Sequence, residues 1–159
     1  MIGNDGRRIA KILRVEGLDL TRLIIAHTDG FFVEHDLKTL VLNPASWQLS
    51  LDYAKTLLDQ GVNLSIDCFG HYWNAELRGV ILETDWQRLA GLVALIQKGY
   101  SGQLVLGTDT FFKVLTRRYG GEGYCRLTKF VIPTLTKLGI SDYDLRQITR
   151  VNPARLLAA

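Results

Sequence analysis

Short apolar runs alternate with longer amphipathic segments along this chain. Residues 22–26, 62–66 and 103–108 are rich in Leu, Ile and Val, and each run ends at a polar residue before a loop. The run ends are roughly 40 residues apart, which leaves room for the helix that a parallel crossover needs. The pattern therefore predicts three neighbouring parallel strands with helices packed outside the sheet.

The segments between and after these runs have the apolar spacing of helices. We predict helices at residues 6–16, 48–60, 85–98 and 124–138. Glycines are expected to end the first three, at Gly17, Gly61 and Gly99. Ser141 is expected to cap a further short helix, and Asn152-Pro153 to open a last helical turn.

The helix at residues 85–98 is the clearest of these predictions. Thr84 is a plausible N-cap because its hydroxyl can accept a hydrogen bond from a free amide in the first turn. Helical spacing predicts that one face of this helix packs on the sheet. The residues expected on that face are Trp86, Leu89, Leu92, Val93 and Ile96.

Three polar residues end the three apolar runs, namely His27, Asp67 and Asp109. In parallel sheets with helices outside, reactive groups gather where strands end and loops begin. His27 could ligate zinc or hydrogen-bond a neighbouring loop. Asp109 could ligate a metal and act as general base toward its water, or it could cap the following segment. The spacing of the residues leaves both alternatives open.

Other polar residues near these ends have less specific roles. Asp67 could orient a ligand, relay a proton or serve the structure, and Asp29 could hold a loop or a histidine. His35 and His71 lie in loops, where we expect solvated side chains.

Composition restricts the classes of function. The chain has 159 residues, 47% of them apolar and 22% charged, which is typical of one globular domain spanning residues 1–159. A net charge of +3 without a basic, aromatic-rich run argues against a nucleic-acid partner. The sequence contains no long apolar stretch and no signal-peptide core, so we expect no membrane association and a cytoplasmic location. Cys68 and Cys125 are expected to be free thiols.

Several short motifs occur together in this chain. They are the strand ends IIAHTD, LSIDCFG and LVLGTDTFFK, and a tail that runs from YGGEGY through GIS to NPAR. Their combination resembles the C-terminal part of the phosphotriesterase family of the amidohydrolase superfamily, which includes phosphotriesterase-related proteins and lactonases. The resemblance extends from about residue 6 to the end. It implies an α/β fold, a partial (β/α)8 TIM barrel made of roughly the last three β/α units, strands six to eight, plus C-terminal helices.

The resemblance also implies a metal-dependent hydrolase. Two divalent metals, expected to be zinc, would activate a water that attacks a small phosphotriester, lactone or related ester. It implies that His27 is the strand-six ligand of the second metal. It implies that Asp109 is the strand-eight ligand of the first metal and the base for the attacking water. Asp67 and Cys68 match the end of strand seven, where family members differ in the second residue. With Asp29, they are expected to support the site or contact substrate.

The family's other metal ligands belong to strands that precede the matched segment. They are a His-x-His pair on strand one, a carboxylated lysine on strand four and a histidine on strand five. A complete barrel takes about 250 residues, so we expect this chain to be a C-terminal portion with little activity alone. A complementing N-terminal half or a homo-oligomer could supply the rest. The alternatives are an inactive remnant or scaffold subunit that needs such a partner, and an unrelated three-layer α/β binding module.

Overall fold

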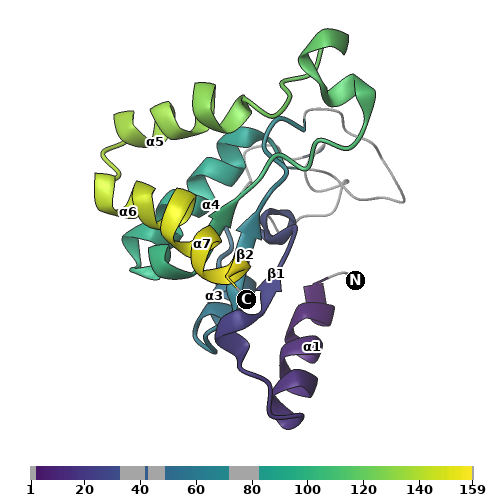
Figure 1. The fold of residues 1–159 in the computed structure, drawn as a ribbon, viewed down its shortest axis with the longest axis vertical. Coiled ribbons are helices and arrows are strands. Elements are labelled where there is room, and N and C mark those ends of the chain that lie inside the picture. Colours follow the sequence, from purple (N-terminus) through teal and green to yellow (C-terminus); the bar gives the residue numbers. More distant parts are fainter. Residues whose placement is uncertain (1–2, 33–41, 43–48, 72–82, 159) are drawn as a thin grey trace.

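The three apolar runs form one parallel sheet in a computed structural model that describes residues 3–32, 42, 49–71 and 83–158. The strands are β1 (Ile24–Ile25), β2 (Asn63–Ile66) and β3 (Leu104–Leu106), in the order β1-β2-β3. Ile24 pairs with Asn63, and Leu64 with Leu104. The predicted strands, their order and their direction are confirmed, although each is shorter than predicted (Figure 1).

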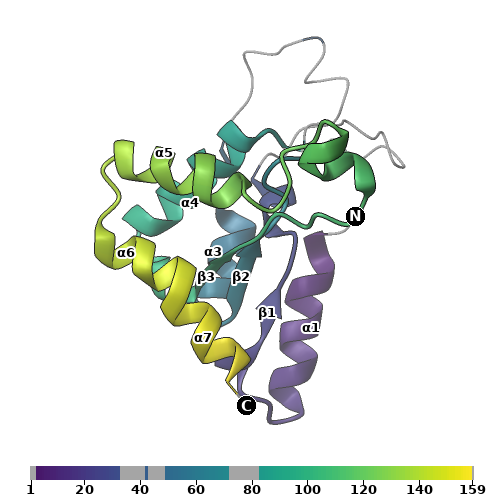
Figure 2. The same ribbon diagram turned by 45° about the horizontal axis from the view of Figure 1, so that its top comes forward.

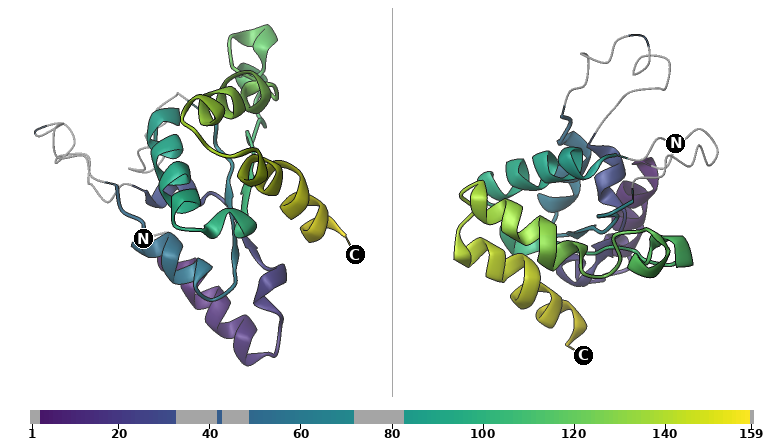
Figure 3. Two further views of the ribbon diagram at one scale, coloured as in Figure 1. Left: turned by 90° about the vertical axis from the view of Figure 1, so that its left-hand side faces the viewer. Right: turned by 90° about the horizontal axis from the view of Figure 1, so that it is seen from above.

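Helices precede, connect and follow these strands. In the left-hand view of Figure 3 the strands run between α4 and the C-terminal helix α7, whereas Figure 2 shows α1 beside β1. Two π-helical turns, Leu127–Val131 and Gln147–Val151, lead directly into α5 and α7. The helices of the described residues are α1 (Gly3–Val15), α3 (Asp52–Leu58), α4 (Asp85–Gln97), α5 (Ile132–Lys137), α6 (Asp142–Arg146) and α7 (Asn152–Leu157).

Most predicted helix boundaries are confirmed. Gly17, Gly61 and Gly99 each adopt a left-handed backbone, with φ of 77°, 89° and 88°. The hydroxyl of Thr84 accepts from the Gln87 amide in a capping box, and the hydroxyl of Ser141 caps α6. The predicted helix at 48–60 begins only at residue 52, and positions 43–48 lie outside the described residues.

The helix predicted at 124–138 is regular only from residue 132 onward. Pro133 sits in the first turn of α5, directly after the π-helical turn. Proline has no backbone N–H and cannot donate within a helix, so an altered turn next to it is physically reasonable. The same arrangement recurs at Pro153, which lies in the first turn of α7.

The predicted buried face of α4 is partly wrong. Trp86 is 65% exposed, whereas the charged side chains of Asp85 and Arg88 are buried. The face that packs inward combines these two residues with Leu89, Leu92 and Leu95. The start of α4 therefore buries the charged pair Asp85 and Arg88, and Trp86 lies on the exposed side of the helix.

Apolar side chains from the sheet and its helices form the core. Every residue of β2 is buried, as expected of a central strand covered on both faces. The core also includes residues from α3, α4, α5 and the π-helical turn before α7. The members at 0% exposure are Ala10, Phe32, Leu57, Val62, Leu64, Ile66, Leu92, Leu95, Leu104, Val131, Leu135 and Ile148.

The C-terminal Asn-Pro-Ala-Arg motif holds the amino ends of the strands together. Asn152, 1% exposed, donates from Nδ2 to the carbonyl oxygens of Ser101 and Leu104, both at 2.7 Å. Arg155 donates to the side-chain oxygen of Asn63 at 2.7 Å and to the carbonyl oxygen of Thr21 at 3.0 Å. The motif therefore fixes all three strands at the end opposite the strand termini that carry His27 and Asp109.

Apolar side chains of β1 and α1 stay partly exposed among the described residues. Ile24 on β1 is 39% exposed, and Ile9, Ile12 and Val15 on α1 are 44%, 50% and 78% exposed. Within the part of the chain that the structure describes, β1 and β3 pair only with β2. None of the described helices has the length and apolar character needed to cross a membrane.

Candidate active site at the carboxyl end of the sheet

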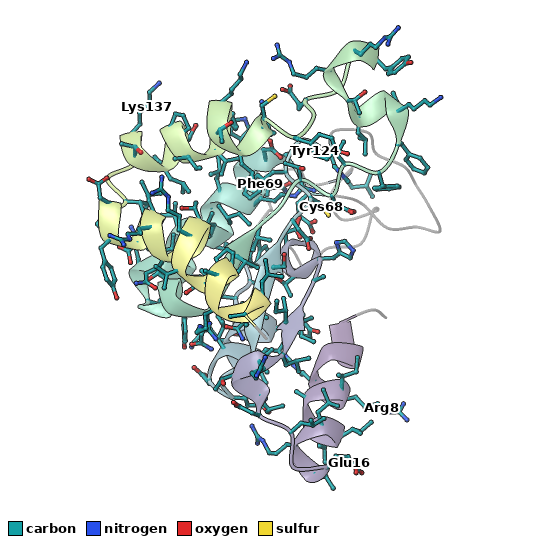
Figure 4. The ribbon with its side chains drawn as sticks, viewed as in Figure 1. Arg8, Glu16, Cys68, Phe69, Tyr124 and Lys137 are labelled. Atoms are coloured by element: carbon teal, nitrogen blue, oxygen red, sulfur yellow. The ribbon has the colours of Figure 1, made fainter. Side chains whose placement is uncertain are left out.

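The residues that end the strands come together at one edge of the sheet. His27 follows β1, Asp67 and Cys68 follow β2, and Asp109 follows β3. Figure 4 labels Cys68 and Tyr124 in the upper part of the molecule, whereas Arg8 on α1 and Glu16, just after α1, lie at the opposite end. One ligand atom each of His27, Cys68 and Asp109 lies within 4.8 Å of the other two.

Asp67 positions the imidazole of His27. Its Oδ1 lies 2.9 Å from His27 Nδ1 and accepts the His27 backbone N–H at 3.1 Å. The imidazole side chain is 61% exposed and that of Asp67 only 15%. A carboxylate on one ring nitrogen fixes the orientation of a histidine and directs its other nitrogen to a ligand.

His27 and Asp109 have an unusual backbone conformation. They are the two non-glycine residues of the described chain with positive φ, 55° for His27 and 40° for Asp109. Such a conformation costs of order 1–3 kcal/mol and tends to occur at functional sites. The strain falls on the two residues that the sequence singled out as metal ligands.

Gly107 allows the ends of β2 and β3 to approach closely. A Cβ atom at this position would lie 2.7 Å from the Cβ of Asp67, and real side chains do not tolerate that distance. The Gly107 amide donates to the carbonyl oxygen of Ile66 at 3.1 Å. Glycine at this point of the Leu-Gly-Thr-Asp motif thus brings Asp109 near the residues that follow β2.

The two residues after His27 anchor the loop that presents it. Thr28 is fully buried and donates from its hydroxyl to the carbonyl oxygen of Ser65 at 2.8 Å. Asp29 is 1% exposed and accepts from Nε of Arg88 at 2.6 Å. The loop that carries His27 is therefore anchored to β2 through Thr28 and to α4 through Asp29.

An ionic network extends from Asp29 along the rim. It consists of the buried residues Asp29, Arg88 and Asp85 and the partly buried Arg126. Arg88 Nη1 lies 3.1 Å from Asp85 Oδ1, and Arg126 Nε lies 2.8 Å from Asp85 Oδ2. The backbone N–H of Gly70 also donates to Asp85, at 2.9 Å. The first turn of α4 thereby ties together the segments that follow β1, β2 and β3.

Burial raises the pKa of three acidic groups in or beside this network. Burial raises the pKa of Asp29 despite the opposing effect of Arg88. It raises the pKa of Glu83 to about 7, and it raises the pKa of the Cys68 thiol well above its usual range. Three buried atoms here, Asp29 Oδ1, Glu83 Oε2 and Arg88 Nη2, have no hydrogen-bond partner among the described residues.

The expectation that His71 is solvated is wrong. His71 is 4% exposed, and its Nε2 lies 2.9 Å from the carbonyl oxygen of Thr108 and 3.0 Å from that of Asp109. The loop after β2 folds back over the end of β3, so that the imidazole braces the backbone carrying Asp109. His35 lies outside the described residues.

The donor atoms at this edge suit a divalent cation. Imidazole, thiol and carboxylate groups from three different strand ends converge on one point, and this set matches the ligands zinc takes in proteins. His27 and Asp109 would each supply a metal ligand, with Asp67 orienting His27. The left-handed backbone of both residues independently marks this point.

Arg88, Asp85 and Glu83 were not anticipated from the sequence. Asp85 and Arg88 are spaced by three residues on the same helical face as Leu92 and Leu95. Charged residues with the same helical spacing as the apolar residues of a buried face could therefore have predicted a buried ion pair. For Glu83, which precedes the cap of α4, no comparable pattern exists.

Comparisons with known proteins agree with this geometry. A sequence model of the phosphotriesterase family matches residues 3–157. An N-acetyltaurine hydrolase of Dictyostelium discoideum is 36% identical over 154 residues, which are 94% of this chain and 36% of that protein.

Two solved structures have the same fold over the matched part. A resiniferatoxin-binding protein of Rhodobacter sphaeroides is 26% identical with a TM-score of 0.77, over 95% of this chain and 38% of that one. A phosphotriesterase homology protein of Escherichia coli, complexed with phosphate in its active site, is 23% identical with a TM-score of 0.75. It matches 99% of this chain and 46% of its own, so the chain spans less than half of each relative.

Proposed function

Because the chain belongs to the phosphotriesterase family, we propose that it carries part of the active site of a metal-dependent hydrolase. The observation that carries this proposal is the convergence of His27, Cys68 and Asp109, with left-handed backbone at both His27 and Asp109. The matched segment corresponds to the last three β/α units of a (β/α)8 barrel, strands six to eight, in this interpretation.

His27 and Asp109 hold divalent metal in this proposal, with two zinc ions in the complete barrel. A bound divalent cation would polarise the oxygen of the scissile group and lower the pKa of the attacking water. Asp109 accepts the proton of that water at a carboxylate oxygen. Asp67 keeps the His27 ring in place through its 2.9 Å contact with Nδ1.

The substrate we propose first is a small N-acylated amine. The Dictyostelium relative is an N-acetyltaurine hydrolase, and hydrolysis of an amide uses the same attack by water as hydrolysis of an ester. Lactones and phosphotriesters are the competing substrates that the family resemblance implies. A panel of N-acetyltaurine, a small lactone and a phosphotriester separates these classes by their kcat/KM values.

The remaining strands must come from elsewhere if the chain is to work as a hydrolase. The exposed apolar face of α1 and the unpaired side of β1 in the described residues fit contact with the preceding part of a barrel. That part could be covalently continuous, a complementing chain or another copy.

The second candidate is an inactive remnant or scaffold subunit of the same ancestry. Metal content separates the candidates: the hydrolase proposal expects about two ions per completed barrel, and a remnant binds none. We expect His27→Ala to lower the zinc content of the completed barrel, measured by elemental analysis after dialysis. Zinc content unchanged by His27→Ala and Asp109→Ala would refute the proposed metal site.

A further inference from the structure

His71 contacts the backbone on both sides of the Asp109 Cα atom. Its Nε2 lies 2.9 Å from the carbonyl oxygen of Thr108 and 3.0 Å from that of Asp109. Carbonyl oxygens only accept, so Nε2 carries a hydrogen that the two oxygens share. These oxygens belong to the peptide units before and after the Asp109 Cα, and each unit is planar. A single imidazole N–H therefore restrains both φ and ψ of Asp109.

The conformation that this contact restrains is a strained one. Asp109 has φ of 40°, in a region that few residues other than glycine occupy, and strain of this kind persists only where surrounding contacts impose it. The φ and ψ angles of a residue set the direction in which its side chain leaves the backbone. The His71 contact thus directs the Asp109 carboxylate, of which one oxygen lies within 4.8 Å of ligand atoms of His27 and Cys68.

The turn that carries His71 is itself anchored. The backbone N–H of His71 donates to the carbonyl oxygen of Cys68 at 3.1 Å, and the N–H of Gly70 donates to Oδ1 of Asp85 on α4 at 2.9 Å. His71 is 4% exposed, and its ring packs against that of Phe111 with 5.9 Å between the centroids. The imidazole is thereby held between a turn tied to α4 and the loop that follows β3.

We propose that His71 is a positioning residue for Asp109, which it holds in place through the two flanking peptide groups. The contact keeps the carboxylate in the direction that metal binding and proton transfer require, while the imidazole takes no part in proton transfer itself. The inference rests on the proposed function, because it takes Asp109 as a metal ligand and base. Loss of a group that orients a metal ligand typically costs about 10–100-fold in metal affinity or activity.

Two amide variants of His71 test the inference, because they differ in reach and keep the same polar group. In His71→Gln the side-chain NH2 can take the place of Nε2, whereas in His71→Asn it falls about one bond length short. In the completed barrel, His71→Asn should lower kcat about 10–100-fold with little change in KM, for the substrate of the panel that is hydrolysed fastest. His71→Gln should restore most of that loss.

Asn152→Ala is the matched control for a merely structural role. Asn152 is also buried and donates from one side chain to two carbonyl oxygens, those of Ser101 and Leu104, but at the amino end of β3. Its loss should lower Tm at least as much as His71→Asn does and leave kcat unchanged. A fall in kcat in His71→Asn that is no larger than in Asn152→Ala would overturn the inference.

Backbone NMR of the chain alone provides a readout that needs neither metal nor turnover. The amide–α-proton coupling and the Cα and Cβ shifts of Asp109 report its backbone conformation. They should move away from the wild-type values in His71→Asn and keep them in His71→Gln and Asn152→Ala. Wild-type values in His71→Asn would overturn the inference whatever the turnover of the barrel. Undiminished turnover in Asp109→Asn would instead refute the proposed function, and the NMR comparison would still decide whether His71 positions Asp109.

Discussion

Replacing Arg88 by methionine should destabilise the chain strongly while preserving the volume and the helix. Arg88 is fully buried and lies 2.6 Å from Asp29 Oδ2 and 3.1 Å from Asp85 Oδ1, with both carboxylates 2% exposed in their side chains. Its removal leaves Asp29 as an unpaired buried carboxylate, while Asp85 keeps its contact with Arg126. Breaking a buried pair in this way costs about 3–5 kcal/mol.

Urea unfolding of the purified chain, followed by circular dichroism, measures this loss. For a chain of this size the same loss lowers Tm by roughly 6–20 °C. Arg14→Met is the matched control. Arg14 is exposed and donates to Gln60 Oε1 at 3.0 Å, so its loss should cost less than about 1 kcal/mol. Asp29→Asn added to Arg88→Met should recover part of the stability. A loss below about 1 kcal/mol for Arg88→Met would show that the network is not buried as described.

Three further changes test other parts of the account. Burial raises the pKa of Glu83 from 4.5 to about 7. The protonated side chain therefore contributes to the free energy of unfolding fully below about pH 4.5, and this contribution is lost as pH rises through about 7. Glu83→Gln should remove up to about 3 kcal/mol of this pH dependence, measured by urea unfolding at several pH values. Asn152→Ala should cost about 2–3 kcal/mol, because two buried carbonyl oxygens lose their donor; an unchanged midpoint would contradict the role of the motif. Gly107→Ala should cost about 1–3 kcal/mol and weaken metal binding in calorimetry, because its Cβ would meet Asp67; unchanged affinity would argue against a site formed by this close approach.

The sheet was predictable because its signal is local. A run such as residues 62–66 carries enough apolar character to identify a buried strand, and the glycines after the helices identify their ends. The chemistry-bearing ends of the strands followed from the same pattern, since parallel strands place His27, Asp67 and Asp109 at one edge.

Contacts that depend on the path of a loop were not predictable in this way. His71 is buried because the loop after β2 folds over Thr108 and Asp109, which are far away in sequence. Arg88 is buried because Asp29 meets it from a segment 59 residues away. A charged residue is expected at the surface unless its partner is known. Helical spacing alone therefore predicts Trp86, and not Arg88, on the buried face.

The left-handed backbone at His27 and Asp109 also had no sequence signature. Histidine and aspartate tolerate such a conformation better than most residues, but neither requires it. Strain of this kind persists only where surrounding contacts impose it. The buried hydroxyl of Thr28 and the His71 contact to the Asp109 backbone are such contacts.

Turnover by a completed barrel tests the central claim most directly. Residues 3–157 of this chain would replace the matching segment of the Dictyostelium N-acetyltaurine hydrolase, and hydrolysis of N-acetyltaurine, a lactone and a phosphotriester would be measured with zinc present. We expect hydrolysis of at least one substrate, falling about 10²–10⁴-fold in Asp109→Asn, because an amide is a poor base and a weaker ligand. Undiminished turnover in Asp109→Asn would contradict the claim that the strand ends of this chain carry the chemistry.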